Sequence, residues 1–123
     1  MKRLTVISDP SMNYEAYDIV TVPFPFTDSA RKKRRPALVL SSHKTFNAPS
    51  GHSVMAMITS AANAPWPLDI AITDLAGAGL PAPSVIRMKL FTLDHRFIIA
   101  KLGVLSNHDK KIVQRTLQSL LVF

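Results

Sequence analysis

The chain has 123 residues, of which 47% are hydrophobic and 19% charged, so we expect one globular domain with a real core and exclude a disordered chain. It has 15 Lys and Arg residues against 8 Asp and Glu, a formal net charge of +7, which favours polyanionic partners: nucleic acid, acidic lipid or an acidic protein. There is no cysteine for a disulfide or a thiolate site, and no apolar run is long enough for a membrane span or a secretory signal, so we expect a cytoplasmic protein without a membrane partner.

The N-terminal half begins with a stretch that has no clear periodicity. We expect residues 1–16 to form a loose arm and 17–123 to form a single domain. In Asp18–Phe26 apolar side chains alternate onto one face, which predicts a strand. Pro23 and Pro25 cannot donate to a strand ladder, so this strand should end in an irregular, edge-like stretch.

Five consecutive cations, from Arg31 to Arg35, come next. Such a run resists burial and repels itself, so we expect an exposed loop. Pro36 biases the residue before it toward an extended conformation, which fixes Arg35 at the point where the loop becomes a strand. The continuous apolar run Ala37–Leu40 is of the kind expected in a buried central strand.

The second half alternates short apolar segments with stretches rich in small and polar residues. Four further strands are predicted: Val54–Thr59, Leu68–Thr73, Val85–Leu90 and Phe97–Leu102. The connections between them predict loops or turns: His43–Ser53, Ser60–Pro67, Leu75–Pro83 and Thr92–Arg96. In Val85–Leu90, Arg87 and Lys89 alternate onto the polar face, which indicates surface charges.

A helix is expected at the C-terminal end. Ser106 precedes Asp109 by three residues, as in a helix N-terminal capping pattern, and apolar residues then recur at helical spacing up to Leu121. About six short strands in succession and one helix, with no regular alternation between the two, predict a mainly β fold: a small, partly closed antiparallel barrel with a C-terminal α-helix.

Six short segments carry a family resemblance. They are DIV at 18–20, FPFTD at 24–28, RRPALVLS at 34–41, ITS at 58–60, PSVIR at 83–87 and LGVLS at 102–106. In this order they closely resemble the MazF/PemK family of bacterial toxins, over about residues 17–121.

The resemblance implies an SH3-like barrel with an added helix, usually as a homodimer. It implies the toxin of a type II toxin–antitoxin system, a ribonuclease that cleaves single-stranded RNA, including mRNA, within a preferred sequence and without a metal or other cofactor. It also implies a cognate antitoxin whose acidic C-terminal segment, otherwise disordered, occupies the RNA groove.

The same resemblance points to three catalytic residues. The family's arginine before the proline of its second strand falls on Arg35, its threonine at the end of the third strand on Thr59, and a later strand arginine on Arg87. Some members have an acid where this chain has Lys89, and many have a glutamate in the loop that reads Ser29–Lys32 here. An arginine- and threonine-centred mechanism is therefore expected, in which guanidinium groups neutralise the phosphate and Thr59 donates to it or orients the 2′-OH.

Further side chains are candidates for RNA binding: Lys33, Arg34, His52, Ser60, Trp66 and Lys89. Trp66, the only tryptophan, could stack a base or pin its loop to the barrel, and we favour pinning. The four histidines have no metal-ligand spacing, so no metal is expected.

Two other functions stay open. One is a toxin of the same fold that acts on a protein, as CcdB-like toxins act on DNA gyrase. The other is a basic module that binds RNA or antitoxin without cleaving, which the lysine at position 89 keeps possible.

Overall fold

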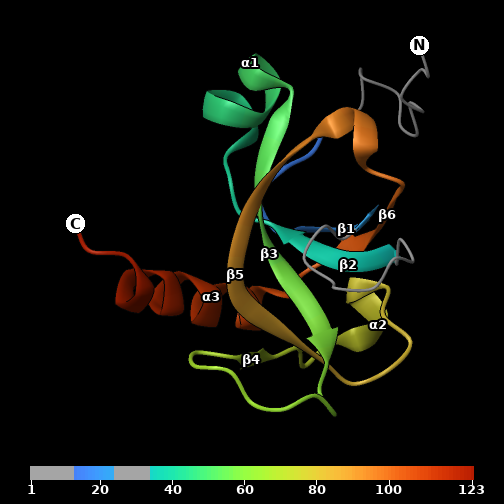
Figure 1. The fold of residues 1–123 in the computed structure, drawn as a ribbon, viewed down its shortest axis with the longest axis vertical. Helices are drawn as coiled ribbons and strands as arrows, with labels where there is room; N and C mark the ends of the chain where they lie inside the picture. Colours follow the sequence, from blue (N-terminus) through green and yellow to red (C-terminus); the bar gives the residue numbers. More distant parts are fainter. Residues whose placement is uncertain (1–12, 24–33) are drawn as a thin grey trace.

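The structure, a computed structural model, describes residues 13–23 and 34–123. In that part of the chain six strands form one antiparallel sheet, and Figure 1 shows it curled on itself with the helix α3 (Asn107–Leu120) beside it. The sheet order is β4-β5-β3-β2-β1-β6, with the bounds β1 (Asp18–Pro23), β2 (Arg34–Val39), β3 (His52–Ser60), β4 (Ile70–Ala71), β5 (Ser84–Asp94) and β6 (Ala100–Val104). The predicted antiparallel barrel with a C-terminal helix is confirmed.

Both faces of the sheet carry buried side chains. Because successive strand residues point to opposite sides, neighbouring residues of one strand belong to different core clusters. One face carries Ile19 and Leu38, which belong to a core cluster that includes Val113 of α3. The other face carries Val20, which belongs to a second cluster with Tyr14. Tyr14 is 1% exposed, so packing begins before residue 17, inside the stretch expected to be a loose arm.

The C-terminal helix begins as its capping pattern predicts. The hydroxyl of Ser106 accepts a hydrogen bond from the backbone N–H of Asp109, at 3.2 Å. The carboxylate of Asp109 is itself fully buried and accepts from the backbone N–H of Thr73 at 2.8 Å and from its hydroxyl at 2.9 Å. The first turn of α3 is thereby tied to the chain that follows β4.

Several predicted boundaries were wrong. The loop 43–53 contains a π-helical turn, η1 (His43–Asn47), and a helical turn, α1 (Ala48–Ser50), before β3 begins. The loop 75–83 contains the short helix α2 (Leu75–Ala78). β4 has two residues, and Leu68, where the longer strand was expected to begin, has φ 66°, a left-handed conformation that a strand cannot contain.

The predicted turn at 92–96 was also misplaced. β5 continues through Asp94 because β3 pairs with it from Ser60 opposite Ser84 to His52 opposite Asp94, with one register shift between Ala56 and Met57. The chain turns only in the 3-10 helix η2 (His95–Phe97), and β6 begins later than predicted. Residues 24–33, which include the predicted end of the first strand and most of the cationic run, lie outside the described residues. No helix in the described ranges is long and apolar enough to cross a membrane.

Candidate functional site: a hollow with Arg35 and Thr59

The first candidate residues come together at one end of the sheet. β2 pairs with β3 from Val39 opposite Met55 to Ala37 opposite Met57, and Arg35 and Thr59 each lie two residues beyond this last pair on their strands. A hollow of about 210 Å³ lies here, lined by Arg35, Pro36, Thr59 and Ser60 together with the segment 80–84. We call it the Arg35 hollow.

Arg35 lines this hollow and carries a hydrogen-bond donor that no described residue uses. Its backbone is held in β2, opposite Val22 of β1. Its Nε is buried and has no hydrogen-bond partner among the described residues. No described residue that lines the hollow is acidic. A buried donor without a partner is costly unless a ligand satisfies it, and the planar guanidinium fork matches a phosphate.

Thr59 is held in place from the turn that follows β3. The residue is 4% exposed, and its Oγ1 accepts a hydrogen bond from the Nδ2 amide of Asn63, at 2.7 Å. Asn63 also donates from its backbone to the carbonyl of Ser60, at 3.1 Å. Because Oγ1 is the acceptor in this bond, the bond does not use the hydroxyl proton of Thr59. The sequence analysis missed Asn63, whose only signal is a polar residue in a turn four positions after Thr59.

Arg87 is committed to other contacts. Its Nε and Nη2 donate to the two carboxylate oxygens of Asp69 at 3.2 and 3.0 Å, and Nη2 also donates to the carbonyl of Ala64 at 2.8 Å. Arg87 is 8% exposed, so the expected surface charge was wrong: the chain between β3 and β4 covers it. Arg87 is not among the residues that line the Arg35 hollow.

The same contacts determine the ionisation of Asp69. Burial alone would raise the pKa of this carboxyl. The hydrogen bond from Arg87, the backbone N–H of Trp66 and the positive charge of Arg87 together outweigh burial and hold the pKa of Asp69 below its ordinary value. Asp69 therefore acts as a fixed counter-ion and is a poor proton acceptor.

The remaining candidates are distributed unevenly. Ser60 lines the Arg35 hollow, and Arg34 is exposed at the start of β2. Trp66 is 43% exposed, with the Nζ of Lys89 4.5 Å from its ring centroid. Lys33 lies outside the described residues.

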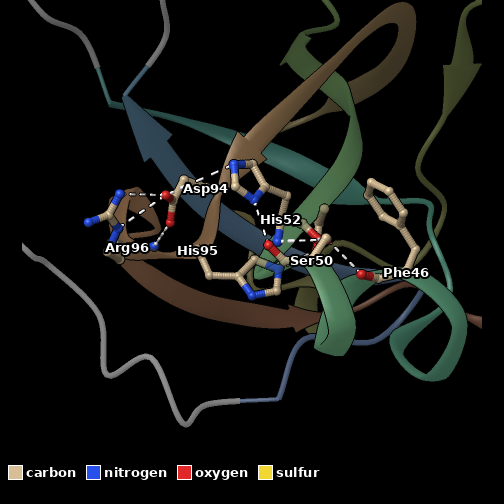
Figure 2. A network of polar contacts seen from close by, with 7 residues as sticks. Phe46, Ser50, His52, Asp94, His95 and Arg96 are labelled. Carbon is tan, nitrogen blue, oxygen red and sulfur yellow. Dashed lines mark hydrogen bonds and ion pairs between the residues drawn. The ribbon is translucent and has the colours of Figure 1, made fainter.

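His52 lies at the other end of β3. Thr59 is seven residues along the strand, which corresponds to roughly 23 Å at about 3.3 Å per residue. Figure 2 shows the ring of His52 between Ser50 and Asp94: Nδ1 lies 2.9 Å from the carbonyl of Ser50, and Nε2 lies 4.0 Å from a carboxylate oxygen of Asp94. These residues line a second hollow of about 230 Å³ with Arg96. The structure thus separates His52 from Arg35 and Thr59.

His95, beside this second hollow, makes stability depend on pH. It is 6% exposed, and its Nε2 lies 2.7 Å from the hydroxyl of Ser53. Burial above all, and then the charge of His52, lowers the pKa of His95. Its contribution to stability is therefore complete above the ordinary histidine pKa of about 6.5 and decreases as the pH falls toward the lowered value.

We expect the urea concentration at the unfolding midpoint of the wild type to decrease when the pH is lowered from 7.5 to 5.5. His95→Gln should unfold more easily at pH 7.5 and show a smaller fall over the same interval. Equal pH dependence in the two proteins would contradict this role for His95.

Among the described residues, no three metal-binding side chains gather at one point.

The fold and the hollow define a class: small antiparallel barrels with a C-terminal helix and a hollow whose described lining includes an arginine and a threonine. The family profile described as PemK-like, MazF-like toxin of type II toxin–antitoxin system matches residues 15–121, and the chain belongs to this family. A comparison with curated protein sequences gives no match.

Solved structures agree with this assignment. A MazE–MazF structure from Deinococcus radiodurans (crystal form III) is 27% identical, covers 89% of this chain and 96% of its own, and superposes with a TM-score of 0.69. MazF from the same organism (form I) is 24% identical, with 89% and 97% coverage and a TM-score of 0.68. An endoribonuclease in complex with its cognate antitoxin from a mycobacterial species shares the fold at 13% identity, with 87% and 91% coverage and a TM-score of 0.66.

Proposed function

We propose that this type II toxin is a metal-independent endoribonuclease that cleaves single-stranded RNA, including mRNA, in the cytoplasm and so stops translation. The observation that carries the proposal is the Arg35 hollow, whose lining includes both Thr59 and Arg35, and the Nε of Arg35 has no hydrogen-bond partner among the described residues. The family membership supports the reaction class.

The reaction in this proposal uses the RNA's own nucleophile. The 2′-oxygen attacks the adjacent phosphorus, the bond from phosphorus to the 5′-oxygen breaks, and the products are a 2′,3′-cyclic phosphate and a 5′-hydroxyl. The proton of the 2′-OH leaves to solvent, and solvent returns a proton to the 5′-oxygen. Arg35 stabilises the charge that develops on the phosphate oxygens, and the hydroxyl of Thr59 donates a hydrogen bond to one of them.

Arg87 takes a different part from the one the resemblance implies. Because two of its nitrogens are bound to Asp69 and Ala64, we assign it the positioning of the chain between β3 and β4, and only its remaining donors could reach a phosphate. The described lining of the hollow includes neither a carboxylate nor an imidazole, so charge stabilisation rather than a paired base lowers the barrier.

We further propose the surface that binds the strand and the partners that occupy it. Arg34, Ser60 and Lys89 contact the RNA backbone, with Lys33 beside Arg34 in the sequence. The formal charge of +7 suits both RNA and an acidic antitoxin segment that competes for the same groove. A homodimer is proposed on the family resemblance, and a cognate antitoxin is supported by the MazE–MazF structures among the neighbours.

The function is tested with two oligonucleotides of one unstructured sequence, one RNA and one DNA, incubated with purified protein in EDTA. We expect the RNA to be cut to products that end in a 2′,3′-cyclic phosphate, and the DNA to stay intact because it lacks the 2′-OH. Intact RNA across a varied set of sequences, or equal cutting of the DNA, would overturn the proposed chemistry.

Thr59→Val tests the second residue of the hollow. The change keeps the shape of the side chain and removes its hydroxyl, so we expect the single-turnover cleavage rate to fall by about 10²-fold. The control is Thr92→Val on β5, where the threonine is exposed and pairs with Val54 at the far end of the strand pair. A Thr59→Val protein that cuts at the wild-type rate would remove Thr59 from the chemistry.

A further inference from the structure

The connection between β3 and β4 is held rigidly beside Thr59. We call residues 61–69 the tryptophan loop. It is tied to Thr59 by the amide of Asn63, and to β5 by Arg87, which binds the carbonyl of Ala64 and the carboxylate of Asp69. Asp69 also closes the loop on itself, because it accepts from the backbone N–H of Trp66 at 3.0 Å.

These polar bonds fix the loop through its backbone and through Asp69, so the indole of Trp66 is not needed to pin it. Trp66 is 43% exposed although it has the largest apolar side chain in the loop. The Nζ of Lys89 lies 4.5 Å from the ring centroid and the Cζ of Arg87 lies 5.9 Å from it. The structure therefore presents a flat aromatic surface next to cations.

The indole lies close to the Arg35 hollow. Arg87 pairs with Met57 and Thr59 pairs with Val85, so Arg87 and Thr59 are diagonal neighbours on one face of the sheet. Such neighbours are about 7 to 8 Å apart. Since the Cζ of Arg87 lies over the ring of Trp66, 5.9 Å from its centroid, the ring lies within reach of a nucleotide next to the phosphate bound at Thr59.

We propose that Trp66 is a stacking platform for one nucleobase of the single-stranded RNA, beside the bond that is cut, and that Lys89 binds the phosphate of that nucleotide. This inference rests on the proposed function and adds a subsite to it. A nucleic acid fits better than an acidic peptide, because the flat, partly exposed ring offers a nucleobase a stacking surface.

Trp66 is the only tryptophan, so its fluorescence reports on this surface alone. The probe is a 2′-O-methyl oligonucleotide, which the proposed chemistry cannot cleave, with the sequence of an RNA that the wild type cuts. We expect saturable quenching, which should disappear when the base at one position next to the cut is replaced by an abasic site. By fluorescence anisotropy of a labelled probe, Trp66→Ala should bind about 5- to 100-fold more weakly, and Trp66→Phe should restore most of the loss.

The matched control is Phe46→Ala, which removes an exposed aromatic ring from η1, near the opposite end of β3, and should leave the affinity unchanged. Wild-type affinity in a folded Trp66→Ala protein, or quenching that no single abasic site removes, would overturn the stacking subsite. If RNA cleavage still depends on Arg35 in that case, the proposed function stands and only this inference fails. A wild type that neither binds the probe nor cuts RNA would overturn both.

Discussion

Arg35→Ala should lower the single-turnover rate of RNA cleavage by about 10²- to 10³-fold, the effect of removing one preorganised donor from a developing negative charge. The fold should survive, because the Nε of Arg35 has no partner among the described residues and its loss leaves no new unsatisfied group. Gel analysis of a labelled RNA, with circular dichroism on the same samples, measures both.

Two variants sharpen this result. Arg34→Ala removes the preceding cation, which is exposed, and should weaken RNA binding without a comparable fall in the rate at saturation. Arg35→Lys keeps the charge but loses the planar fork that binds two phosphate oxygens, so most of the activity should stay lost. Full activity in Arg35→Ala would remove Arg35 from the chemistry. Equal loss in the Arg34 and Arg35 variants would show that Arg35 only adds charge.

Breaking the ion pair between Asp69 and Arg87 should destabilise the protein by about 2 to 4 kcal/mol. The side chains are 18% and 10% exposed, and the loss of one partner from a fully buried pair costs about 3 to 5 kcal/mol whereas an exposed pair contributes about 1 or less. Asp69→Asn, Arg87→Gln and the double variant, compared by urea unfolding, give the coupling energy. The double variant should lose less than the sum of the single losses.

The exposed pair between Arg96 and Asp94 provides the control, and Arg96→Gln should have a much smaller effect than Arg87→Gln.

The pH dependence of the stability that Asp69 contributes has a definite sign. Since the pKa of Asp69 is lowered in the folded protein, its contribution is complete above the ordinary aspartate value of about 3.9 and is lost as the pH falls through the lowered value. Additive losses in the two single variants would contradict a coupled pair.

The sequence predicts the parts of this fold that depend on local patterns. The cap at Ser106 and the helical spacing after it identify α3, and the apolar run 37–40 identifies the central strand β2. The extent of β5 was not predictable in this way. Its last residues read as a turn, and only pairing with β3, about 40 residues away in the chain, keeps them in the sheet.

The site residues likewise include some that the sequence could predict and some that it could not. Arg35 and Thr59 were named from a family resemblance, and the structure brings both into the lining of one hollow, just beyond the paired part of β2 and β3. The alternation of residues along β5 predicted that Arg87 would be a surface charge. The prediction failed because Arg87 is buried by Asp69 and by the loop between β3 and β4, which has no periodic pattern in the sequence. His52 and Thr59 belong to one strand, and strand geometry places them at its opposite ends.

The most direct test is to incubate wild type and Arg35→Ala side by side in EDTA with a long RNA that lacks stable structure, and to map the new 5′ ends. We predict discrete cuts by the wild type, within a short preferred sequence, that are absent or at least 100-fold slower with the variant. Cuts that persist unchanged in Arg35→Ala would place the chemistry elsewhere. A folded wild type that makes no cuts would point to a toxin that acts on a protein or to a binding module without ribonuclease activity.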